Sequence, residues 1–376
     1  MKVGIDLTAL LPIGTGVDTY LKQLVTHLGQ LDQKNRYTIF VTHQGRSILK
    51  EALPPNFAIA SYPVRPRPAR LLFQQLWLPA AAVFSGIDVI HSPSFLSPLY
   101  RGRQRHLLTV HDMTFFLLPD CHTRLHRSRL FRQAIVQSIR GADLVSVPSN
   151  STKQDLLGLV PEVSASRVRI IPYGVDEDFV PADYAAVQAA LRRLRLPERY
   201  ILYVGSIEPR KNLEHLVRSY RRLIADGSIA EHLVLAGPLG WNYEPLIKQL
   251  EVPELRGRVH MPGNIARRDL PWLYAGARLF VYPSRYEGFG FPPLEAMACG
   301  VPTVASSSSS LGENLDGAAK LVPANDEAAL TLAINRLLHD EELRAQYRKK
   351  GLARAAEFCW QKTAQQTLNC YMELAQ

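Results

Sequence analysis

Short runs of apolar, largely β-branched residues alternate along the chain with stretches whose apolar residues have helical spacing. Runs this uniformly apolar are typical of parallel strands that are buried on both faces. In the first half they predict strands at residues 3–5, 37–41, 88–90, 107–110, 144–147 and 168–171. The pattern starts again in the second half, at residues 200–204, 233–236, 259–261, 279–282 and 303–305. The chain is therefore predicted to be α/β, with two Rossmann-like doubly wound parallel sheets.

The junction between the two series of strands is marked by an acidic segment at residues 176–178 and a basic helix at residues 190–195. We place the boundary near residue 180, which predicts an N-terminal domain over residues 1–180 and a C-terminal domain over residues 181–358. A last helix is predicted within residues 359–376, and no strand follows it. From the pattern alone, this helix could pack on either domain.

The composition agrees with two globular cores. A chain of 376 residues, 47% hydrophobic and 21% charged, is too long for one ordinary core and too apolar to be disordered. The N-terminus lacks the features of a signal peptide, and no run approaches the roughly 20 apolar residues that span a bilayer. A cytoplasmic location is therefore predicted. The four cysteines do not have the spacing of a zinc site or a disulfide framework; they are Cys121, Cys299, Cys359 and Cys370.

The formal charge of +10 is concentrated in three basic segments of the first half, at residues 65–70, 101–105 and 122–129. The favoured interpretation is a solvated surface that keeps the protein soluble. The alternative is peripheral contact with an anionic membrane or a lipid-linked acceptor, because residues 122–129 and the apolar residues after them resemble a segment that rests on a lipid leaflet. No nucleic-acid-binding signature accompanies the charge, so a nucleic-acid partner is not predicted.

A strand, a glycine-rich loop and a helix follow one another in residues 279–300. The loop lies at the carboxyl end of a predicted parallel strand, where open α/β sheets bind their ligands. Pro292 and Gly300 delimit the helix, whose free N-terminal amides suit a diphosphate. Glu287 in the loop and Glu295 in the helix can face one pocket and accept hydrogen bonds from vicinal sugar hydroxyls. The alternative is a structural helix with an acid in its first turn.

Two adjacent cations, Arg210 and Lys211, follow the predicted strand at residues 200–204 and precede a helix. Cations are unfavourable at a helix N-terminus, so an anionic ligand would explain them. Together they could neutralise a pyrophosphate that leaves with growing negative charge. For this pair taken alone, a solvated surface is the alternative.

The first half carries two weaker signals. Gly14, Thr15 and Gly16 form a loop that could let the backbone approach a diphosphate, but the full dinucleotide-binding spacing is missing and a plain turn is the alternative. His111 follows the predicted strand at residues 107–110, where a histidine is well placed for a site. A lone histidine in such a place is also often structural.

Together these motifs resemble the retaining GT-B glycosyltransferases of family 4 (glycosyl transferases group 1), and in particular their bacterial mannosyltransferase-like members. The resemblance rests on residues 205–212, 282–284 and 287–302, and it extends to residues 14–16, 91–93, 111–112, 148–151 and 171–175. It implies a GT-B fold, in which two domains face each other across a cleft that holds the donor. It also implies that the last helix packs back on the N-terminal domain.

The resemblance implies a role for each motif. Glu287 would hold the donor sugar, Glu295 the ribose, and Arg210 and Lys211 the diphosphate, with His111 beside the sugar. The predicted catalytic residues are thus His111, Arg210, Lys211 and Glu287. The predicted donor-binding residues are Gly14, Thr15, Gly16, Gly205, Ser206, Asn264, Ile265, Phe289, Gly290, Phe291, Leu294 and Glu295.

The chain departs from the family pattern at residues 306–310, where five serines stand in place of a frequent proline-glutamate pair. It also has no Asp-x-Asp motif, which fits a mechanism in which fixed cations and amides replace a divalent metal ion. No metal site and no cofactor are therefore predicted.

The predicted activity is retaining, metal-independent transfer of a hexose to a lipid-linked, polysaccharide or small-molecule acceptor. GDP-mannose is the favoured donor, while UDP-glucose, UDP-galactose and UDP-N-acetylglucosamine stay open. Two alternatives remain: a nucleotide-sugar epimerase of similar fold, and a catalytically silent nucleotide-sugar-binding protein. The predicted partners are the nucleotide sugar, a glycan or lipid-linked acceptor and, peripherally, the inner face of an anionic membrane.

Overall fold

A computed structural model describes residues 1–10, 16–46, 53–62, 72–100, 102–122 and 127–376. The chain forms two compact units. The N-terminal unit contains Met1–Leu117, Arg124–Gly174 and Cys359–Gln376, and the C-terminal unit contains Leu118–Thr123 and Val175–Phe358. The division falls between Gly174 and Val175, slightly before the predicted boundary at residue 180.

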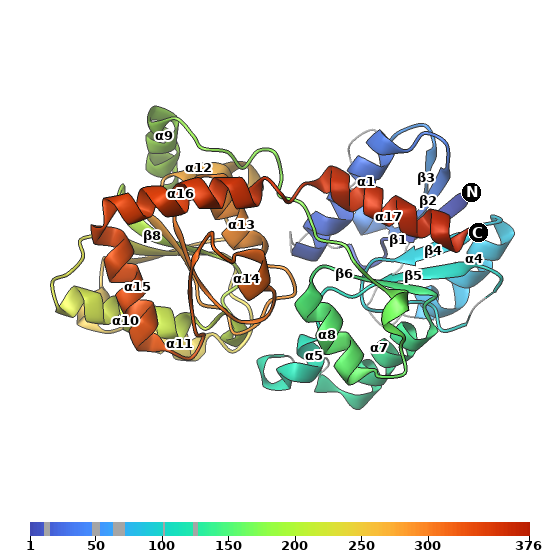
Figure 1. The fold of residues 1–376 in the computed structure, drawn as a ribbon, viewed down its shortest axis with the longest axis horizontal. Coiled ribbons are helices and arrows are strands. Elements are labelled where there is room, and N and C mark those ends of the chain that lie inside the picture. Colours follow the sequence, from blue (N-terminus) through green and yellow to red (C-terminus); the bar gives the residue numbers. More distant parts are fainter. Residues whose placement is uncertain (11–15, 47–52, 63–71, 101, 123–126) are drawn as a thin grey trace. The chain divides into compact units, whose positions relative to one another are not determined.

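The N-terminal unit is built on a seven-stranded parallel sheet with the order β3-β2-β1-β4-β5-β6-β7 (Figure 1). Its strands are β1 (Lys2–Asp6), β2 (Arg36–Thr42), β3 (Phe57–Tyr62), β4 (Val89–Ser92), β5 (Arg105–Thr109), β6 (Leu144–Val147) and β7 (Val168–Ile170). All neighbours pair in parallel. Six of these strands match the predicted apolar runs. The sequence pattern missed β3, because this edge strand is only half-buried and lacks a continuous apolar run.

Helices connect and cover the strands of this sheet. They are α1 (Gly16–Leu31), α2 (His43–Arg46), the π-helix η1 (Phe73–Trp77), α4 (Leu78–Phe84), α5 (Thr114–Leu117), α7 (Arg129–Gly141), α8 (Asn150–Leu159) and α17 (Trp360–Leu374). In the core, α4 packs on apolar residues of β2 and β4, and α7 packs on those of β5 and β6. The short 3-10 helices η2 (Pro119–Cys121) and η3 (Ala165–Arg167) lie in connecting segments.

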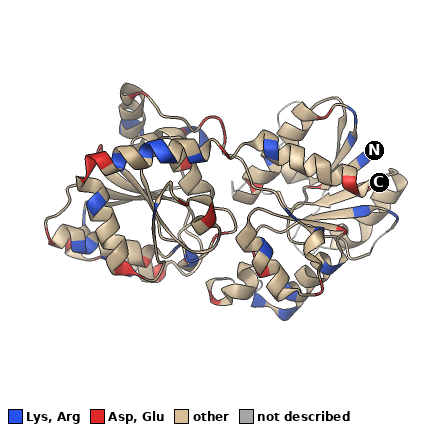
Figure 2. Cartoon of the chain, viewed as in Figure 1, with Lys and Arg blue, Asp and Glu red and all other residues tan. Residues whose placement is uncertain are grey.

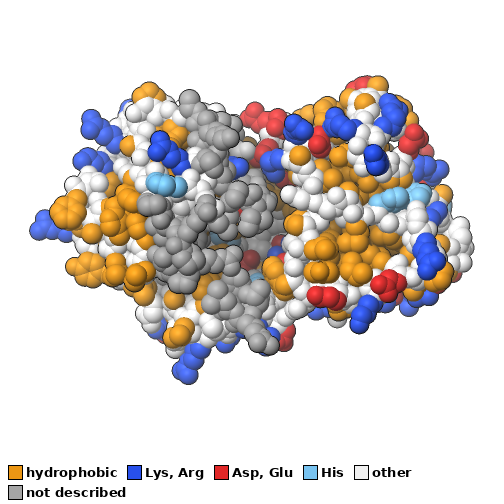
Figure 3. Space-filling model, turned by 180° about the vertical axis from the view of Figure 1, so that it is seen from behind, with side chains coloured by type: hydrophobic (Ala, Val, Ile, Leu, Met, Phe, Trp, Pro, Cys, Tyr) orange, Lys and Arg blue, Asp and Glu red, His pale blue; other side chains and the backbone are white. Residues whose placement is uncertain are grey.

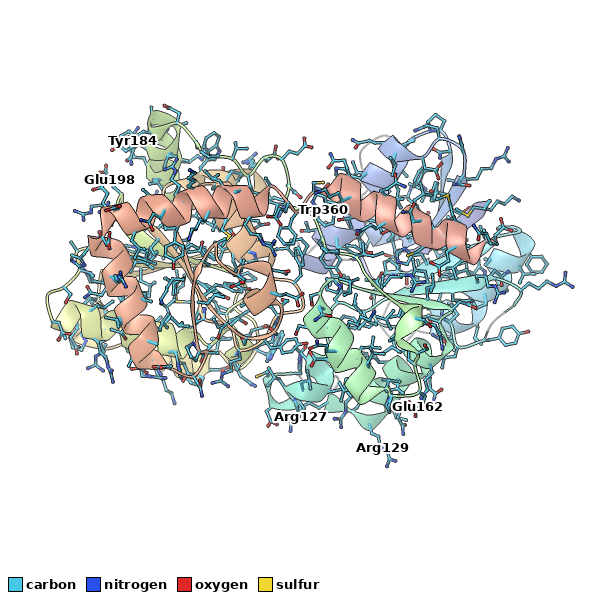
Figure 4. The ribbon with its side chains drawn as sticks, viewed as in Figure 1. Arg127, Arg129, Glu162, Tyr184, Glu198 and Trp360 are labelled. Atoms are coloured by element: carbon cyan, nitrogen blue, oxygen red, sulfur yellow. The ribbon has the colours of Figure 1, made fainter. Side chains whose placement is uncertain are left out.

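The last helix, α17, packs beside α1 in the N-terminal unit, although it follows the whole C-terminal unit in sequence (Figure 1). A buried network of hydrogen bonds joins it to the sheet. The Tyr371 hydroxyl lies 2.7 Å from His91 Nδ1, and His91 Nε2 lies 2.8 Å from Thr109 Oγ1. Trp360, at the start of α17 in Figure 4, is also buried. A Cβ at Gly174 would lie 2.3 Å from the Trp360 backbone nitrogen, so only glycine fits there.

The C-terminal unit repeats the plan with a six-stranded parallel sheet of order β10-β9-β8-β11-β12-β13. Its strands are β8 (Tyr200–Val204), β9 (His232–Ala236), β10 (Val259–Gly263), β11 (Leu279–Tyr282), β12 (Thr303–Ser306) and β13 (Lys320–Val322). Five of them were predicted. The short edge strand β13 was missed, since three residues carry too little pattern to distinguish a strand from a loop.

The helices of this unit are α9 (Tyr184–Leu194), α10 (Leu213–Ala225), α11 (Glu244–Leu250), α12 (Leu270–Ala275), α13 (Phe291–Ala298), α14 (Ser309–Asn314), α15 (Glu327–His339) and α16 (Glu341–Ala355). Short 3-10 turns are η4 (Pro209–Lys211), η5 (Pro253–Leu255) and η6 (Arg267–Asp269). Because β8, β11 and β12 are parallel neighbours, the segments after them meet at one edge of the sheet. These segments are η4, the glycine-rich loop and the serine run.

Candidate functional site

The glycine-rich loop joins β11 to α13 and is shaped by one glycine. Gly290 has a φ of 91°, and a Cβ at this position would lie 2.5 Å from Leu311 Cδ2. The left-handed backbone strongly favours glycine here, and a larger residue would also have to displace the end of the Leu311 side chain. The loop therefore approaches α14 closely, and its Phe289 carbonyl accepts a 2.8 Å hydrogen bond from the Asn314 side chain.

Glu287 lies at the centre of a buried ionic network at this edge of the sheet. Its Oε1 accepts hydrogen bonds from Lys211 Nζ at 2.6 Å and Ser284 Oγ at 2.6 Å, and its Oε2 lies 2.9 Å from Arg210 Nη1. The Tyr282 hydroxyl donates to the same Oε1 at 3.1 Å. Burial alone would raise the pKa of Glu287, but Arg210 and Lys211 outweigh it and lower that pKa to about 2. Glu287 is therefore ionised at neutral pH.

Arg210 and Lys211 reach Glu287 from η4, directly after β8. A second carboxylate, Glu208, also holds Arg210, with 2.9 Å between Arg210 Nη2 and Glu208 Oε1. Buried Lys211 and half-buried Arg210 thus face two buried carboxylates. Burial and the neighbouring Arg210 charge lower the pKa of Lys211, although Glu287 opposes the shift. An anion that binds here would meet cations that are already paired and fixed in position. The sequence motifs did not reveal that Glu208 is one of the partners of Arg210.

The serine run holds the glycine-rich loop in place. Ser310 Oγ donates to the Glu287 carbonyl at 2.8 Å, and Ser309 Oγ accepts from the Glu287 amide at 2.8 Å. Ser306 Oγ and Ser308 Oγ both donate to the Ser284 carbonyl. Residues 306–310 therefore form hydrogen bonds with the backbone of Ser284 and with the backbone of Glu287. Their role was open in the sequence, because the contact lies between segments about 20 residues apart.

The second predicted carboxylate, Glu295, is buried in α13 with its own partners. The Tyr274 hydroxyl donates to Glu295 Oε2 at 2.8 Å, and Arg267 Nη2 lies 3.6 Å from Oε1. Arg267 also pairs with Asp176 at 2.5 Å. Burial raises the pKa of Glu295, and the Asp176 charge adds to this, while Arg267 opposes it. The sequence motifs missed Tyr274, Arg267 and Asp176, which precede Glu295 by many residues.

The other predicted donor positions of the C-terminal unit follow β8 and β10, lie in the glycine-rich loop or belong to α13. Gly205 and Ser206 follow β8, where the Gly205 amide donates to the Ala236 carbonyl at 2.9 Å. Exposed Asn264 and half-buried Ile265 follow β10. Phe289 is buried, Phe291 is half-buried, and Leu294 is fully buried in the core of the unit. A donor contact at Leu294 would therefore have to come from its backbone.

His111 lies in the N-terminal unit with both ring nitrogens in hydrogen bonds. His111 Nε2 lies 2.9 Å from the Pro93 carbonyl, so it carries the proton and donates, and Nδ1 accepts from the Tyr173 hydroxyl at 2.6 Å. Burial lowers the pKa of His111 to about 4, so the ring is neutral at pH 7. Gly16 begins α1, whereas Gly14 and Thr15 lie outside the described residues.

Three further observations concern the described residues. The four cysteines are free thiols. Within the described ranges, no three histidine, cysteine or acidic side chains are placed to share a metal ion. None of the helices in the described part of the chain is long and apolar enough to cross a bilayer.

Both halves of the chain match glycosyltransferase families. Residues 14–179 match Glycosyltransferase Family 4, and residues 190–354 match Glycosyl transferases group 1. Among proteins of similar sequence, the O-antigen chain mannosyltransferase B of Escherichia coli is 34% identical over 284 residues, which are 75% of this chain and 74% of that protein. The MMP alpha-(1->4)-mannosyltransferase of Mycolicibacterium hassiacum is 29% identical over 323 residues, 78% of this chain and 73% of that protein.

Solved structures of other glycosyltransferases share the fold. Sucrose-phosphate synthase from Thermosynechococcus elongatus superimposes with a TM-score of 0.82 at 23% identity, covering 99% of this chain and 98% of that one. Anabaena Alr3699/HepE, solved in complex with UDP-glucose, gives 0.78 at 19% identity, with 99% and 100% covered. The two parallel-sheet α/β units are those of the GT-B fold. The chain therefore belongs to the family 4 glycosyltransferases, as the motifs around Arg210, Lys211, Glu287 and Glu295 indicate.

Proposed function

We propose that the chain transfers mannose from GDP-mannose to a glycan, lipid-linked or small-molecule acceptor, with retention of configuration and without a metal ion. The sugar is proposed because mannosyltransferases of Escherichia coli and Mycolicibacterium hassiacum are among the most similar sequences. Alr3699/HepE, a more distant structural relative, was solved with UDP-glucose, so uridine donors are the main competing choice. The proposed location is cytoplasmic, with peripheral contact to an anionic membrane.

The network of Arg210, Lys211 and Glu287 carries the proposal. In the transfer, the bond between the sugar C1 and the diphosphate oxygen breaks, and the diphosphate keeps the electron pair. The acceptor hydroxyl forms the new bond at C1 from the same face, and its proton passes to the departing diphosphate. The negative charge on the leaving group grows in the transition state, and cations held by buried carboxylates are already oriented to receive it.

The carboxylates in the network keep both cations in fixed positions before the donor arrives. An unpaired lysine or arginine would be solvated and mobile, and would have to reorganise as the bond breaks. In this site, Glu208 holds Arg210, and Glu287 holds both Arg210 and Lys211. We further propose that Glu287 and the adjacent loop amides bind the sugar hydroxyls, and that Glu295 binds the ribose.

A donor panel tests the proposal. Purified protein is incubated with GDP-mannose, UDP-glucose, UDP-galactose and UDP-N-acetylglucosamine, with and without EDTA, and nucleoside diphosphate release and sugar products are measured. The proposal expects faster release from GDP-mannose than from the uridine donors, unchanged by EDTA. Interconversion of nucleotide sugars would favour an epimerase, and binding without turnover would favour a silent binding protein.

A further inference from the structure

An uncharged, largely apolar segment of the N-terminal unit leaves an apolar face exposed. Residues 71–87 contain no charged side chain, and the ribbon of α4 is correspondingly tan in Figure 2. Leu72, Leu76, Val83 and Phe84 follow one another at helical spacing along η1 and α4, and all are exposed, with Phe84 reaching 91%. Trp77, Leu78 and Ala82 of the same segment turn inward and pack on the sheet. The segment therefore has a buried apolar side and an exposed apolar side.

The loop after β4 extends this surface. Leu99 and Tyr100 are also exposed, and the loop is tied to η1 because the Leu99 amide donates to Gln75 Oε1 at 2.8 Å and Gln75 Nε2 donates to the Ser97 carbonyl at 3.0 Å. We call Leu72, Leu76, Val83, Phe84, Leu99 and Tyr100 the apolar face. In Figure 3, apolar side chains gather at the edge of the N-terminal unit where α4 lies in Figure 1. Soluble proteins rarely leave such a group of large apolar side chains in water without a partner.

Positive charge borders the apolar face. Lys2 Nζ lies 3.0 Å from the Ser85 carbonyl at the end of α4. A Cβ at Gly102 would lie 3.1 Å from Val83 Cγ2, which places exposed Arg103 next to the face. The acidic neighbours are Asp88, whose side chain accepts from the Lys2 amide, and Asp143, which pairs with Arg105.

The charge of the whole unit has the same sign. The N-terminal unit contains 21 lysines and arginines against 10 aspartates and glutamates, whereas the C-terminal unit contains 23 against 24. The unit that carries the apolar face thus has a net charge of +11, and the C-terminal unit has a net charge of −1. A second copy of the chain docking through this face would bring two positive units together, which is unfavourable. An anionic bilayer offers both an apolar interior and opposite charge.

We propose that the apolar face docks on the surface of an anionic lipid bilayer, with its large side chains inserted at the boundary between headgroups and acyl chains. This proposal rests on the proposed function and extends it, because a membrane surface would present a lipid-linked acceptor to the enzyme. The mode of attachment is peripheral and combines apolar insertion with electrostatic attraction, so it depends on both lipid charge and salt.

A matched pair of double variants tests the proposal. Leu76→Ser with Tyr100→Ser removes two side chains of the apolar face that are 66% and 73% exposed. Leu332→Ser with Tyr184→Ser removes a leucine and a tyrosine of the C-terminal unit that are 67% and 72% exposed; Tyr184 lies on α9 (Figure 4). Flotation with vesicles of phosphatidylcholine, alone or mixed with phosphatidylglycerol, measures binding of the full chain.

We expect wild type and the Leu332/Tyr184 variant to float with the mixed vesicles and not with pure phosphatidylcholine, and to be released when salt rises from about 0.1 to about 0.5 M. The Leu76/Tyr100 variant should bind at least about tenfold more weakly, because it loses two inserted apolar groups. Equal binding by both variants, or no charge preference in wild type, would overturn the proposal. So would a wild-type dimer that the Leu76/Tyr100 variant converts to a monomer.

Donor turnover in detergent-free solution separates this proposal from the proposed function. The Leu76/Tyr100 variant should release nucleoside diphosphate from the donor at the wild-type rate, because none of its substitutions is in the ionic network. Lipid binding without any donor turnover would refute the proposed function and leave the docking surface intact. Turnover without lipid binding would refute only the docking surface.

Discussion

At the scale of single residues, the site is defined by the side chains that stabilise each other's charge. Glu287 is buried and stays ionised because two cations and two hydroxyls surround one carboxylate. Removing one member of such a network leaves the others charged and unpaired, which costs more than the pair contributes when complete. Substitutions here should therefore change both turnover and stability.

Glu287→Gln should lower kcat by about 100-fold or more, because Arg210 and Lys211 lose the carboxylate that orients them. It should also alter the acid stability. The pKa of Glu287 falls to about 2 in the folded protein, so its contribution is present above the unfolded value and is lost as pH falls from about 4.5 to about 2. Urea unfolding across this range should show a loss on the order of 3 kcal/mol in wild type. An equally steep loss in Glu287→Gln would contradict this assignment.

Lys211→Ala should reduce kcat by about 100 to 1000-fold with a smaller change in KM, since charge on the leaving diphosphate is greatest in the transition state. Glu295→Ala should instead weaken nucleotide binding, measured by calorimetry. Arg268→Ala is the control, because its side chain is 88% exposed and lies in the same unit. Unchanged turnover in Lys211→Ala would count against the proposed leaving-group role.

At the scale of elements, the active-site loop depends on a neighbouring segment for its shape. Four serines of residues 306–310 bond to the backbone at Ser284 and Glu287. The sequence predicted β11, β12, the glycine loop and α13, because each has a local pattern. It did not reveal the function of the serines, because hydrogen bonds between separate loops leave no periodicity in the sequence.

Ser310→Ala should reduce kcat/KM by about fivefold and destabilise the C-terminal unit by about 1 kcal/mol, because the buried Glu287 carbonyl loses a hydrogen bond. Steady-state kinetics with the active donor and thermal unfolding measure the two effects. Ser307→Ala is the matched control, since Ser307 is exposed at the same turn. Equal losses in both variants would show that the effect is not specific to the loop.

At the scale of the whole molecule, the last helix returns to the N-terminal unit and is held by buried polar groups. His91, which contacts Tyr371 of α17, is neutral because burial lowers its pKa to about 3, with a smaller effect of His111. His111 is neutral for the same physical reason. Both histidines take up a proton when the unit unfolds at mildly acidic pH.

The free energy of unfolding should therefore decrease as pH falls below about 6.5. The unfolded chain binds these protons at pH 6.5, whereas the folded histidines bind them only near pH 3 to 4. Each buried histidine adds a slope of about 1.4 kcal/mol per pH unit between those limits. Urea unfolding at pH 7, 6 and 5 measures how steeply the free energy of unfolding depends on pH. His91→Gln should remove the contribution of one of the two histidines and leave that of His111. A slope unchanged in that variant would show that His91 is not the titrating group.

Local pattern determined most of the architecture. Eleven of the strands in the two sheets coincide with predicted apolar runs; most of them are buried on both faces, and such a strand must be apolar along its whole length. The motifs around Arg210, Lys211, Glu287 and Glu295 follow from residue type at the carboxyl ends of strands, where parallel sheets place their ligands. The half-buried β3 and the short β13 escaped because their burial is incomplete or brief.

Tertiary structure alone decided which side chains complete the site. The serines and Arg267 act through contacts between segments that are separate in sequence, and such contacts depend on how parallel strands align at one edge of the sheet. The same holds for the exposed side of η1 and α4. Its apolar residues look in the sequence like those of any buried helix, and only the packing of the opposite side onto the sheet shows which of them remain in contact with solvent.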